Sequence, residues 1–388
     1  MFVIRLVLKN SLRHKLRTLL TVLGIAIAVL AFGVLRTIVT AWSSGVEASA
    51  ANRMITRHAV SFILPLPLAY RDQIARTPGV ESVTYASWFQ GSYKDPNEWS
   101  NFFPRFAVDA NTFFQIYAEF LIPPGEMETF LKERNACVIG EKLSRDQKLA
   151  IGDQITIEGD IFPGQWTFVV RAIYKGKDAT TDETQMFFHW EYLNERLRED
   201  APGRANQVGW YVMKVQKPED MARIAQAVDA LYENSRASTK TESEREFQQG
   251  FVSMSSAIIT SLEAVSYIVI LIILLVLANT IVMAARERTK EYAVLKTIGF
   301  SSKHLAGLIG GESLLIGLAG SAVGLALTIP AANGVGAAFP TMFPVFAVQS
   351  GTMIMSVAIG LLAGLVAAAF PVLRTLHTSI ANGLRSIG

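Results

Sequence analysis

A cluster of charged residues between Arg286 and Phe300 is the part of the sequence whose residue types could do chemistry. Arginine and lysine side chains pair with carboxylates on another protein, and a few apolar side chains at the end of a short helix can fill a groove in it. Very apolar segments precede and follow this cluster, so a solvated face alone does not explain its charge density. The pattern favours contact with a partner protein, and the candidate contact residues are Arg286, Glu287, Arg288, Lys290, Glu291, Leu295, Lys296, Ile298, Gly299 and Phe300.

Patterns for catalysis and cofactor binding are absent from the sequence. It has no Gly-x-x-x-x-Gly-Lys-Ser/Thr loop for nucleotide phosphates, no Gly-x-Ser-x-Gly elbow and no conspicuous pair of catalytic carboxylates. Its five histidines are scattered, without partners at metal-ligand spacing. The single cysteine, Cys137, excludes a disulfide within one chain and is interpreted as a buried apolar residue rather than a reactive thiol. We expect no enzyme activity, no metal and no cofactor in this chain.

The segments that position the charged cluster are hydrophobic enough to lie in a membrane. The chain has 388 residues, of which 51% are hydrophobic and 18% charged, with a mean hydropathy of +0.31. A helix needs about 20 apolar residues to cross a bilayer. Four segments satisfy this requirement and are predicted as transmembrane helices at 19–42, 264–285, 305–329 and 352–373.

The distribution of charge predicts how these helices are oriented. Residues 1–18 carry five cations and no acid, whereas residues 43–257 hold 23 Lys and Arg against 29 Asp and Glu. Loops on the cytoplasmic side are enriched in cations. We therefore expect both termini and the charged helix at 286–304 in the cytoplasm. The segments expected accordingly are a domain at 43–240 and an outer loop at 330–351 outside, and a tail at 374–388 inside.

Residues 1–18 predict an amphipathic basic helix on the cytoplasmic surface of the membrane, because most of their apolar residues and cations fall on different sides. The alternative is a cleaved signal peptide, with Ala48-Ser49-Ala50 as the cleavage box. That box lies well beyond an apolar run that is already long enough to span a bilayer. We therefore favour the surface helix.

The outer domain at 43–240 shows the short alternating runs and turn signals of a mixed α and β fold. The predicted helices are 71–75 and 218–235, and the predicted strands are 80–85, 136–139, 155–157, 166–174 and 208–215. Residues 241–263 read as a stalk helix that continues into the second span. The sequence thus predicts an α-helical membrane protein with four transmembrane helices and an α+β extracytoplasmic domain inserted between spans 1 and 2.

Three charged residues and four glycines in or near the predicted spans are candidates for a functional or packing role. Glu312 either takes part in a contact between helices or in gating, or is an acid near the interface satisfied by Ser313, water or a cation. Arg36 lies near one end of the first span, where it can reach the headgroups, and Glu263 is expected to be solvated. Close helix packing is predicted at Gly320, Gly324, Gly360 and Gly364, within one chain or between two.

These motifs resemble those of FtsX-like ABC transporter permeases. The resemblance rests on Asn279-Thr280, on Ala285-Arg286-Glu287-Arg288-Thr289-Lys290-Glu291 and on Leu295-Lys296-Thr297-Ile298-Gly299-Phe300, followed by Glu312, Leu314-Leu315-Ile316-Gly317 and Pro371-x-x-Arg374 with Leu384-Arg385. Pro78-Gly79-Val80-Glu81, Val138-Ile139-Gly140 and Gly152-Asp153-Gln154-Ile155 are similar to the MacB-type periplasmic core domain. Family members often carry a proline near the position of Ser379, which this chain lacks.

The resemblance implies a permease subunit that works by mechanotransmission in a bacterial inner membrane, with its large domain in the periplasm. A separate cytosolic ABC ATPase dimer would bind ATP and Mg and move the 286–300 helix, and the periplasmic domain would export or extract an amphipathic, lipid or peptide substrate. Four spans imply a dimer with a second copy or a related permease, a periplasmic adaptor is a further partner for export, and no nucleic acid is expected. The alternatives are an FtsX-like regulator of a periplasmic enzyme and a structural or sensory anchor without an ATPase.

Overall fold

The computed structural model describes residues 15–42, 49–98, 101–178, 180–254, 256–287, 289–338 and 346–377. They form two compact units, one made of long apolar helices and the other of Trp42–Ser255 with Gly336–Val345. The basic helix predicted at 1–18 and the predicted tail at 374–388 lie almost entirely outside the described residues.

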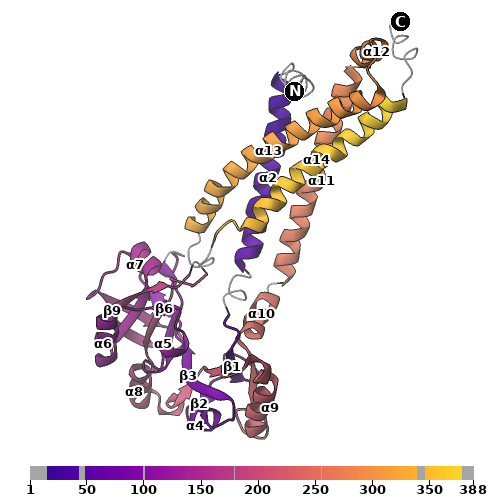
Figure 1. The fold of residues 1–388 in the computed structure, drawn as a ribbon. Helices are drawn as coiled ribbons and strands as arrows, with labels where there is room; N and C mark the ends of the chain where they lie inside the picture. The colour runs from indigo at the N-terminus through magenta and orange to yellow at the C-terminus, as the bar shows by residue number, and fades with distance from the viewer. Residues whose placement is uncertain are drawn as a thin grey trace. The chain divides into compact units, whose positions relative to one another are not determined.

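Among the described residues, the helical unit contains four long helices and one short one (Figure 1). They are α2 (Lys15–Trp42), α11 (Ser256–Glu287), α12 (Thr289–Thr297), α13 (Ser302–Ala338) and α14 (Ser350–His377). Among the described residues, three helical stretches are long and apolar enough to cross a membrane, at Thr18–Trp42, Ser256–Met283 and Ser302–Ala338. A shorter apolar helical stretch covers Ser350–Val366. The count of four spans therefore stays a prediction.

The four long helices share one apolar core. Ile25 of α2, Leu277 of α11, Ile316 of α13 and Ala363 of α14 are all buried within it. In Figure 1 these helices run alongside one another. Exposed aliphatic side chains cover the rest of the helices, which is the pattern of helices whose outer faces meet lipid rather than water.

Glycines allow α13 to approach two neighbours closely. A Cβ built on Gly320 would lie 2.6 Å from Cβ of Ile25 on α2, and one on Gly324 would lie 2.7 Å from the Ala26 carbonyl oxygen. On α14, a Cβ on Gly364 would lie 2.7 Å from the Ser313 carbonyl oxygen, and Gly360 faces the side chain of Ser321 in the same way. The structure therefore places these four glycines at contacts between helices of a single chain.

The predicted boundary between the third span and the outer loop at 330–351 differs from the structure. α13 continues through Pro330 to Ala338, so the first nine residues of that expected loop are helical. Proline removes one backbone N–H and is tolerated inside helices of membrane proteins, where neighbouring groups can satisfy the freed carbonyl. Pro330 therefore does not end the helix, contrary to the sequence prediction, but lies within α13.

One ion pair joins two helices of this unit. The Nη1 atom of Arg36 on α2 lies 3.3 Å from Oε1 of Glu263 on α11. The sequence predicted a solvated Glu263; its side chain keeps 40% exposure, and the structure adds Arg36 as its partner. Both side chains are about one-third exposed (33% and 40%), so the pair contributes only about 0–1 kcal/mol.

The second unit is a mixed domain whose elements alternate along the chain. Its strands are β1 (Arg53–His58), β2 (Leu66–Pro67), β3 (Val80–Trp88), β4 (Gly91–Tyr93), β5 (Arg105–Val108), β6 (Phe120–Leu121), β7 (Ala136–Gly140), β8 (Gln154–Gly159), β9 (Gly164–Gly176), β10 (Met186–His189), β11 (Gln207–Val208), β12 (Trp210–Val215) and β13 (Thr239–Ser243). Its helices are α4 (Tyr70–Ala75), α5 (Phe113–Ile116), α6 (Pro124–Lys132), α7 (Glu141–Gln147), α8 (Trp190–Asp200), α9 (Met221–Tyr232) and α10 (Glu244–Met254), with short 3₁₀ turns at Pro202–Arg204 (η2) and Pro218–Asp220 (η3). The predicted helix at 71–75 and the predicted strands at 80–85, 136–139, 155–157 and 166–174 are confirmed with small changes of boundary. The strand predicted at 208–215 is divided between β11 and β12, which belong to different sheets, and the helix predicted at 218–235 consists of the turn η3 and the shorter helix α9.

Eleven strands form one sheet in the order β13-β1-β12-β3-β5-β10-β7-β9-β8-β4, with β6 on β9. Its pairs are antiparallel except for β10 with β5 and β7 with β9. Side chains alternate between the two faces with the period of two that a strand imposes. On β12, for example, Trp210 and Val212 belong to one apolar core and Tyr211 and Met213 to the other.

Helices cover both faces of this sheet. One core takes side chains from α4, α7, α8 and α9, and the other takes them from α5, α6 and α10. Both cores are rich in aromatic rings; Phe187, for example, packs against Phe113 with centroids 5.1 Å apart. A domain with two such cores buries enough apolar surface to hold its shape without a disulfide.

The predicted stalk helix at 241–263 begins three residues later than expected. Thr241, Glu242 and Ser243 belong to β13, which pairs with β1 in the register Thr56↔Thr241. The side chain of Asp229 on α9 accepts hydrogen bonds from the Thr241 backbone N–H at 3.0 Å and from its hydroxyl at 2.7 Å. Pairing with β1 and capping by Asp229 outweigh the helical periodicity. The helix α10 then starts at Glu244.

We predict that Gly324→Val loosens the helical unit by about 1–3 kcal/mol or more, because the added methyl groups meet Val29 and the Ala26 carbonyl of α2. The measurement is the thermal unfolding temperature of the full chain in detergent. Gly310→Ala on the same helix is the control, since a Cβ there meets nothing within 4 Å. Equal unfolding temperatures for the two variants would contradict the close packing of α13 on α2.

Candidate functional site

The predicted contact segment forms a short helix between two long ones. Arg286 and Glu287 belong to the last turn of α11, and α12 spans Thr289–Thr297 before α13 begins at Ser302. Arg288 lies outside the described residues, as do the side chains of Arg286 and Lys290. The helix that the sequence placed at 286–304 is therefore divided among three helices.

α12 ends in a glycine-dependent turn that redirects the chain. Gly299 has a φ of 101°, a conformation that residues with a Cβ rarely adopt. The Gly299 N–H donates to the Lys296 carbonyl oxygen at 3.1 Å, and the Phe300 N–H donates to the Leu295 carbonyl oxygen at 3.0 Å. These two bonds are those of a Schellman motif, which closes a helix and satisfies its last carbonyls. The Thr297-Ile298-Gly299 ending thus sets the point at which α12 stops.

The next helix starts just after this turn with its own cap. The Ser301 hydroxyl lies 2.6 Å from Nδ1 of His304, and the Ser301 carbonyl accepts the N–H groups of His304 and Leu305. The ring of Phe300 meets that of His304 edge-on, with centroids 6.1 Å apart. Residues 297–304 therefore form a tight corner between α12 and α13.

The apolar residues of α12 divide between two directions. Leu295 packs against Leu305 and Leu308, which are buried at the start of α13. Val294 and Ile298 are exposed, 48% and 71% respectively, and one helical turn separates them. Among the described side chains of α12 and the turn that follows it, the exposed large apolar residues are therefore Val294 and Ile298, whereas the sequence suggested Leu295, Ile298 and Phe300.

Val294 is the residue of this surface that the sequence argument missed. Its position four residues before Ile298 could have identified it, because residues at i and i+4 share one side of a helix. Among the described charged side chains, Glu287 is exposed, and Glu291 and Lys296 are half-buried. The exposed apolar pair is thus flanked along the chain by acids and a cation.

Glu312 lies on α13, half-buried, one residue before a fully buried serine. The hydroxyl of that residue, Ser313, donates to the Ile309 carbonyl oxygen at 2.9 Å. The Ser313 hydroxyl therefore donates its hydrogen to the backbone of its own helix rather than to Glu312. A role for Glu312 in gating or in helix contact stays a prediction.

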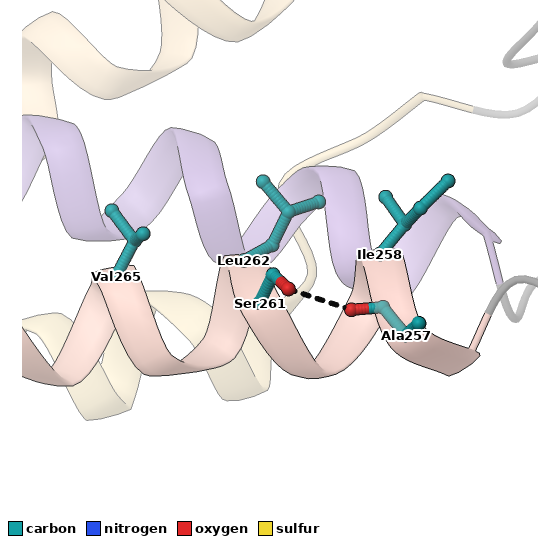
Figure 2. Close-up of a pocket in the computed structure, with 5 residues that line it drawn as sticks. All are labelled: Ala257, Ile258, Ser261, Leu262 and Val265. Atoms are coloured by element: carbon teal, nitrogen blue, oxygen red, sulfur yellow. Dashed lines mark hydrogen bonds between the residues drawn. The ribbon is translucent and has the colours of Figure 1, made fainter.

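A shallow apolar groove of about 340 Å³ lies on the surface of α11. It is lined by Ala257, Ile258, Ser261, Leu262 and Val265. Figure 2 shows Ile258, Leu262 and Val265 rising from one side of the helix, while the Ser261 hydroxyl donates to the Ala257 carbonyl oxygen at 2.7 Å. Because its single hydroxyl is already bonded, this groove offers carbon surface and suits an apolar chain rather than a polar ligand.

Chemical groups that could catalyse or bind a metal do not gather in the part of the chain that the structure describes. No group of three or more His, Cys, Asp or Glu side chains there could hold a metal ion. Burial raises the pKa of the Cys137 thiol well above its ordinary value, so little thiolate forms at neutral pH. A role of the α12 segment as a contact surface stays a prediction.

Two family models match the chain in succession. The model of the MacB-like periplasmic core domain matches residues 18–231, and the model of the FtsX-like permease C-terminal region matches residues 263–380. The first covers more than half of the chain. The second includes α12 and the corner that follows it.

Two curated relatives carry similar descriptions. An uncharacterized ABC transporter permease of Methanocaldococcus jannaschii is 23% identical over 343 residues, which make up 84% of this chain and 82% of that protein. An uncharacterized ABC transporter permease protein of Mycobacterium tuberculosis is 23% identical over 270 residues, 67% of this chain. This chain spans only 30% of the length of the mycobacterial relative.

Solved structures show similarity over about half of the chain. The periplasmic region of MacB from Actinobacillus actinomycetemcomitans is 10% identical, with 53% of this chain and 95% of that one covered and a TM-score of 0.38. The extracellular domain of the noncanonic ABC-type transporter YknZ from Gram-positive bacteria is also 10% identical, with 49% and 100% covered and a TM-score of 0.36.

We predict that Gly299→Ala weakens the corner between α12 and α13, because a Cβ at this φ strains the backbone by roughly 1–3 kcal/mol. Hydrogen–deuterium exchange of the full chain in detergent would then be faster at Ile298 to Phe300. Gly307→Ala on α13 is the control, since a Cβ there meets nothing within 4 Å. Unchanged exchange at the corner in Gly299→Ala would show that the turn does not depend on glycine.

Proposed function

The chain belongs to the ABC transporter permeases that combine a MacB-like periplasmic core domain with an FtsX-like C-terminal region, and on that premise we propose that it couples ATP hydrolysis by a separate cytosolic ATPase to motion of its periplasmic domain. ATP and Mg would be bound by the ATPase dimer, and this chain would carry no cofactor and no catalytic residue. Both termini and α12 would lie in the cytoplasm of a bacterium, with the sheet domain in the periplasm.

The exposed pair on α12 carries this proposal. Val294 and Ile298 present aliphatic surface between two long apolar helices, and Leu295 holds the opposite side of α12 against α13. The Schellman turn at Gly299 fixes where this surface ends. A rigid apolar pair of this kind, with Lys296 and Arg286 and Arg288 nearby in sequence, is suited to a groove rimmed by acids.

The connection from α12 to the membrane supports transmission of motion. α12 packs through Leu295 on the start of α13, and α13 is locked to α2 and α14 through its glycines. Movement of α12 by a partner would therefore shift packed helices rather than a loose loop. Such shifts of rigid elements are the usual form of long-range coupling in proteins.

The substrate class that we propose is an amphipathic molecule, a lipid or a peptide, exported or extracted from the membrane. Ile258, Leu262 and Val265 give α11 an exposed apolar surface that such a molecule could contact, and activation of a periplasmic enzyme is the alternative function. A second permease copy or a related permease would complete the transporter, and a periplasmic adaptor would serve export.

We predict that Ile298→Glu weakens association with the ATPase roughly 30-fold, the equivalent of about 2 kcal/mol for an apolar residue at the centre of an interface. Ile298 is 71% exposed, so the fold should tolerate the change. The measurement is the amount of ATPase that co-purifies with the tagged full chain from its own cells, with the ATP hydrolysis rate of the complex.

The control is Leu231→Glu, which places the same charge on a 53% exposed leucine of α9 in the other unit. Lys296→Glu tests the electrostatic part of the contact and should also reduce association. If both α12 variants retain the ATPase as well as Leu231→Glu does, α12 is not the docking site. If no ATPase accompanies even the unmodified chain, the proposed function itself fails.

A further inference from the structure

Arg53, the first residue of β1, lies in a buried cluster of charges within the sheet domain. Its Nε atom is 2.8 Å from Oε2 of Glu244, and its Nη2 atom is 2.7 Å from Oε1 of Glu119. The side chains of Arg53 and Glu244 are each only 5% exposed. One guanidinium therefore joins two carboxylates that come from distant parts of the chain.

Further bonds lock this cluster in place. Glu244 accepts the backbone N–H of Ala50 at 3.1 Å and the hydroxyl of Tyr117 at 3.1 Å. The guanidinium of Arg53 lies 4.2 Å from the centre of the Tyr117 ring, and it also donates to the Ile116 carbonyl oxygen at 3.4 Å. Both carboxylate oxygens of Glu244 therefore accept hydrogen bonds. The N–H groups of the guanidinium donate to Glu119, Glu244 and the Ile116 carbonyl, while one flat face of it lies over the Tyr117 ring.

The electrostatic cost of such a cluster is high. Burial alone would lower the pKa of Arg53, but the hydrogen bond to Glu119 and the charge of Glu244 outweigh burial, and the net pKa is raised. Burial, followed by the charge of Glu244, raises the pKa of Tyr117. Well-packed apolar residues usually stabilise a core at least as well as a buried ion pair does. Stability alone is therefore a poor explanation for these charges.

The cluster joins three segments that have different places in the chain. Ala50 and Arg53 stand where the chain starts β1 after α2, and Glu244 begins α10, the last helix before α11. Tyr117 and Glu119 lie in the turn between α5 and β6, and β6 pairs with β9, which lies between β7 and β8 in the sheet order. The segments that connect the domain to both neighbouring membrane helices thus meet a turn whose strand, β6, pairs with β9 in the half of the sheet away from β13.

We infer that Arg53 is a positioning residue that makes the start of β1, the start of α10 and the α5–β6 turn move as one body. A displacement of α10 would then reach β9 through Glu244, Arg53 and Glu119 rather than be absorbed at the edge strand β13. This inference deepens the proposed function and rests on it for the effect of ATP, while its mechanical part concerns the sheet domain alone.

The same two strands offer a matched control pair. Arg57 lies four residues after Arg53 on β1, and its Nε atom is 2.9 Å from Oε1 of Glu242 on β13. Both side chains are mostly buried, 17% and 11% exposed, as in the Arg53 cluster. Among the described residues, the hydrogen bonds and ion pairs of Arg57 and Glu242 stay within β1 and β13 and do not reach α10 or the α5–β6 turn.

The first experiment compares Arg53→Met with Glu244→Gln and with the control Arg57→Met by hydrogen–deuterium exchange of the full chain in lipid nanodiscs. Loss of a buried partner should open the joined segments, so amides of Glu244–Met254 and of Phe113–Leu121 should exchange roughly tenfold faster in both test variants. Arg57→Met should leave both segments close to the unmodified chain. Equal effects of Arg53→Met and Arg57→Met would overturn the inference.

Tyr117→Phe guards against a variant that fails to fold. It removes one hydroxyl bond to Glu244 and keeps both contacts of Arg53 with carboxylates, so it should fold and show a smaller increase in exchange at the same two segments. An increase confined to α10, without any at Phe113–Leu121, would show that the segments move separately and would contradict the inference.

The second experiment repeats the exchange measurement with the co-purified ATPase complex, with and without ATP. The unmodified complex should show an ATP-dependent change at Phe113–Leu121, and Arg53→Met should lose that change while the ATP hydrolysis rate is retained. A merely structural role would not separate these two readouts. If the unmodified complex shows no response to ATP, the proposed function fails. If Arg53→Met responds as the unmodified complex does, the inference fails.

Discussion

The close approach of α13 to α2 and α14 is the constraint on which the helical unit depends. Lipid gives apolar helices no solvent-driven reason to associate, so contact must come from dense packing, which small residues permit. Gly320 and Gly324 bring α13 against α2, and Gly317 brings it against the Gly360 carbonyl of α14. Since α12 rests on α13 through Leu295, the position of the exposed residues Val294 and Ile298 follows from this packing.

Three buried hydroxyl groups of α13 form hydrogen bonds within that helix. The hydroxyls of Ser313, Ser321 and Thr328 each donate to the carbonyl oxygen four residues earlier in α13. A buried hydroxyl bonded within its own helix needs no partner on the neighbouring helix. These three hydroxyls of α13 are therefore satisfied within their own helix where it packs against its neighbours.

Local patterns predicted much of the architecture, because apolar runs and alternation need no knowledge of distant residues. Strands such as Trp166–Tyr174 and the helix after Pro218 were visible in this way. Errors occurred where a distant residue decides. Sequence patterns place Thr241 in a helix, because they do not show that Asp229 and β1 lie beside it. They also do not show that Arg36 pairs with Glu263.

In the segment predicted to contact a partner, local features were likewise predictable and those that depend on distant residues were not. The sequence located the segment and the glycine ending, since a helix stop at Gly299 follows from local chemistry. It assigned Leu295 to the partner because it could not show that Leu305 and Leu308 cover this side chain. Val294 was missed for the same reason, since which side of a helix is exposed depends on what packs against the other side.

The same dependence on distant partners explains why the Arg53 cluster was invisible in the sequence. Glu119 lies 66 positions after Arg53 along the chain, and Glu244 lies 191 positions after it. Nothing in their spacing marks them as neighbours. Buried charges assembled from such distances become evident only when the sheet order places β1 beside β13.

The carboxylate of Asp229 has a consequence for how the domain meets other proteins. A strand at the end of a sheet normally offers free N–H groups to any passing chain, and these are the groups through which sheets extend or aggregate. At β13 one such group, the Thr241 N–H, is already bound by Asp229. A strand added at this edge would have to displace that bond, which favours recognition through side chains there.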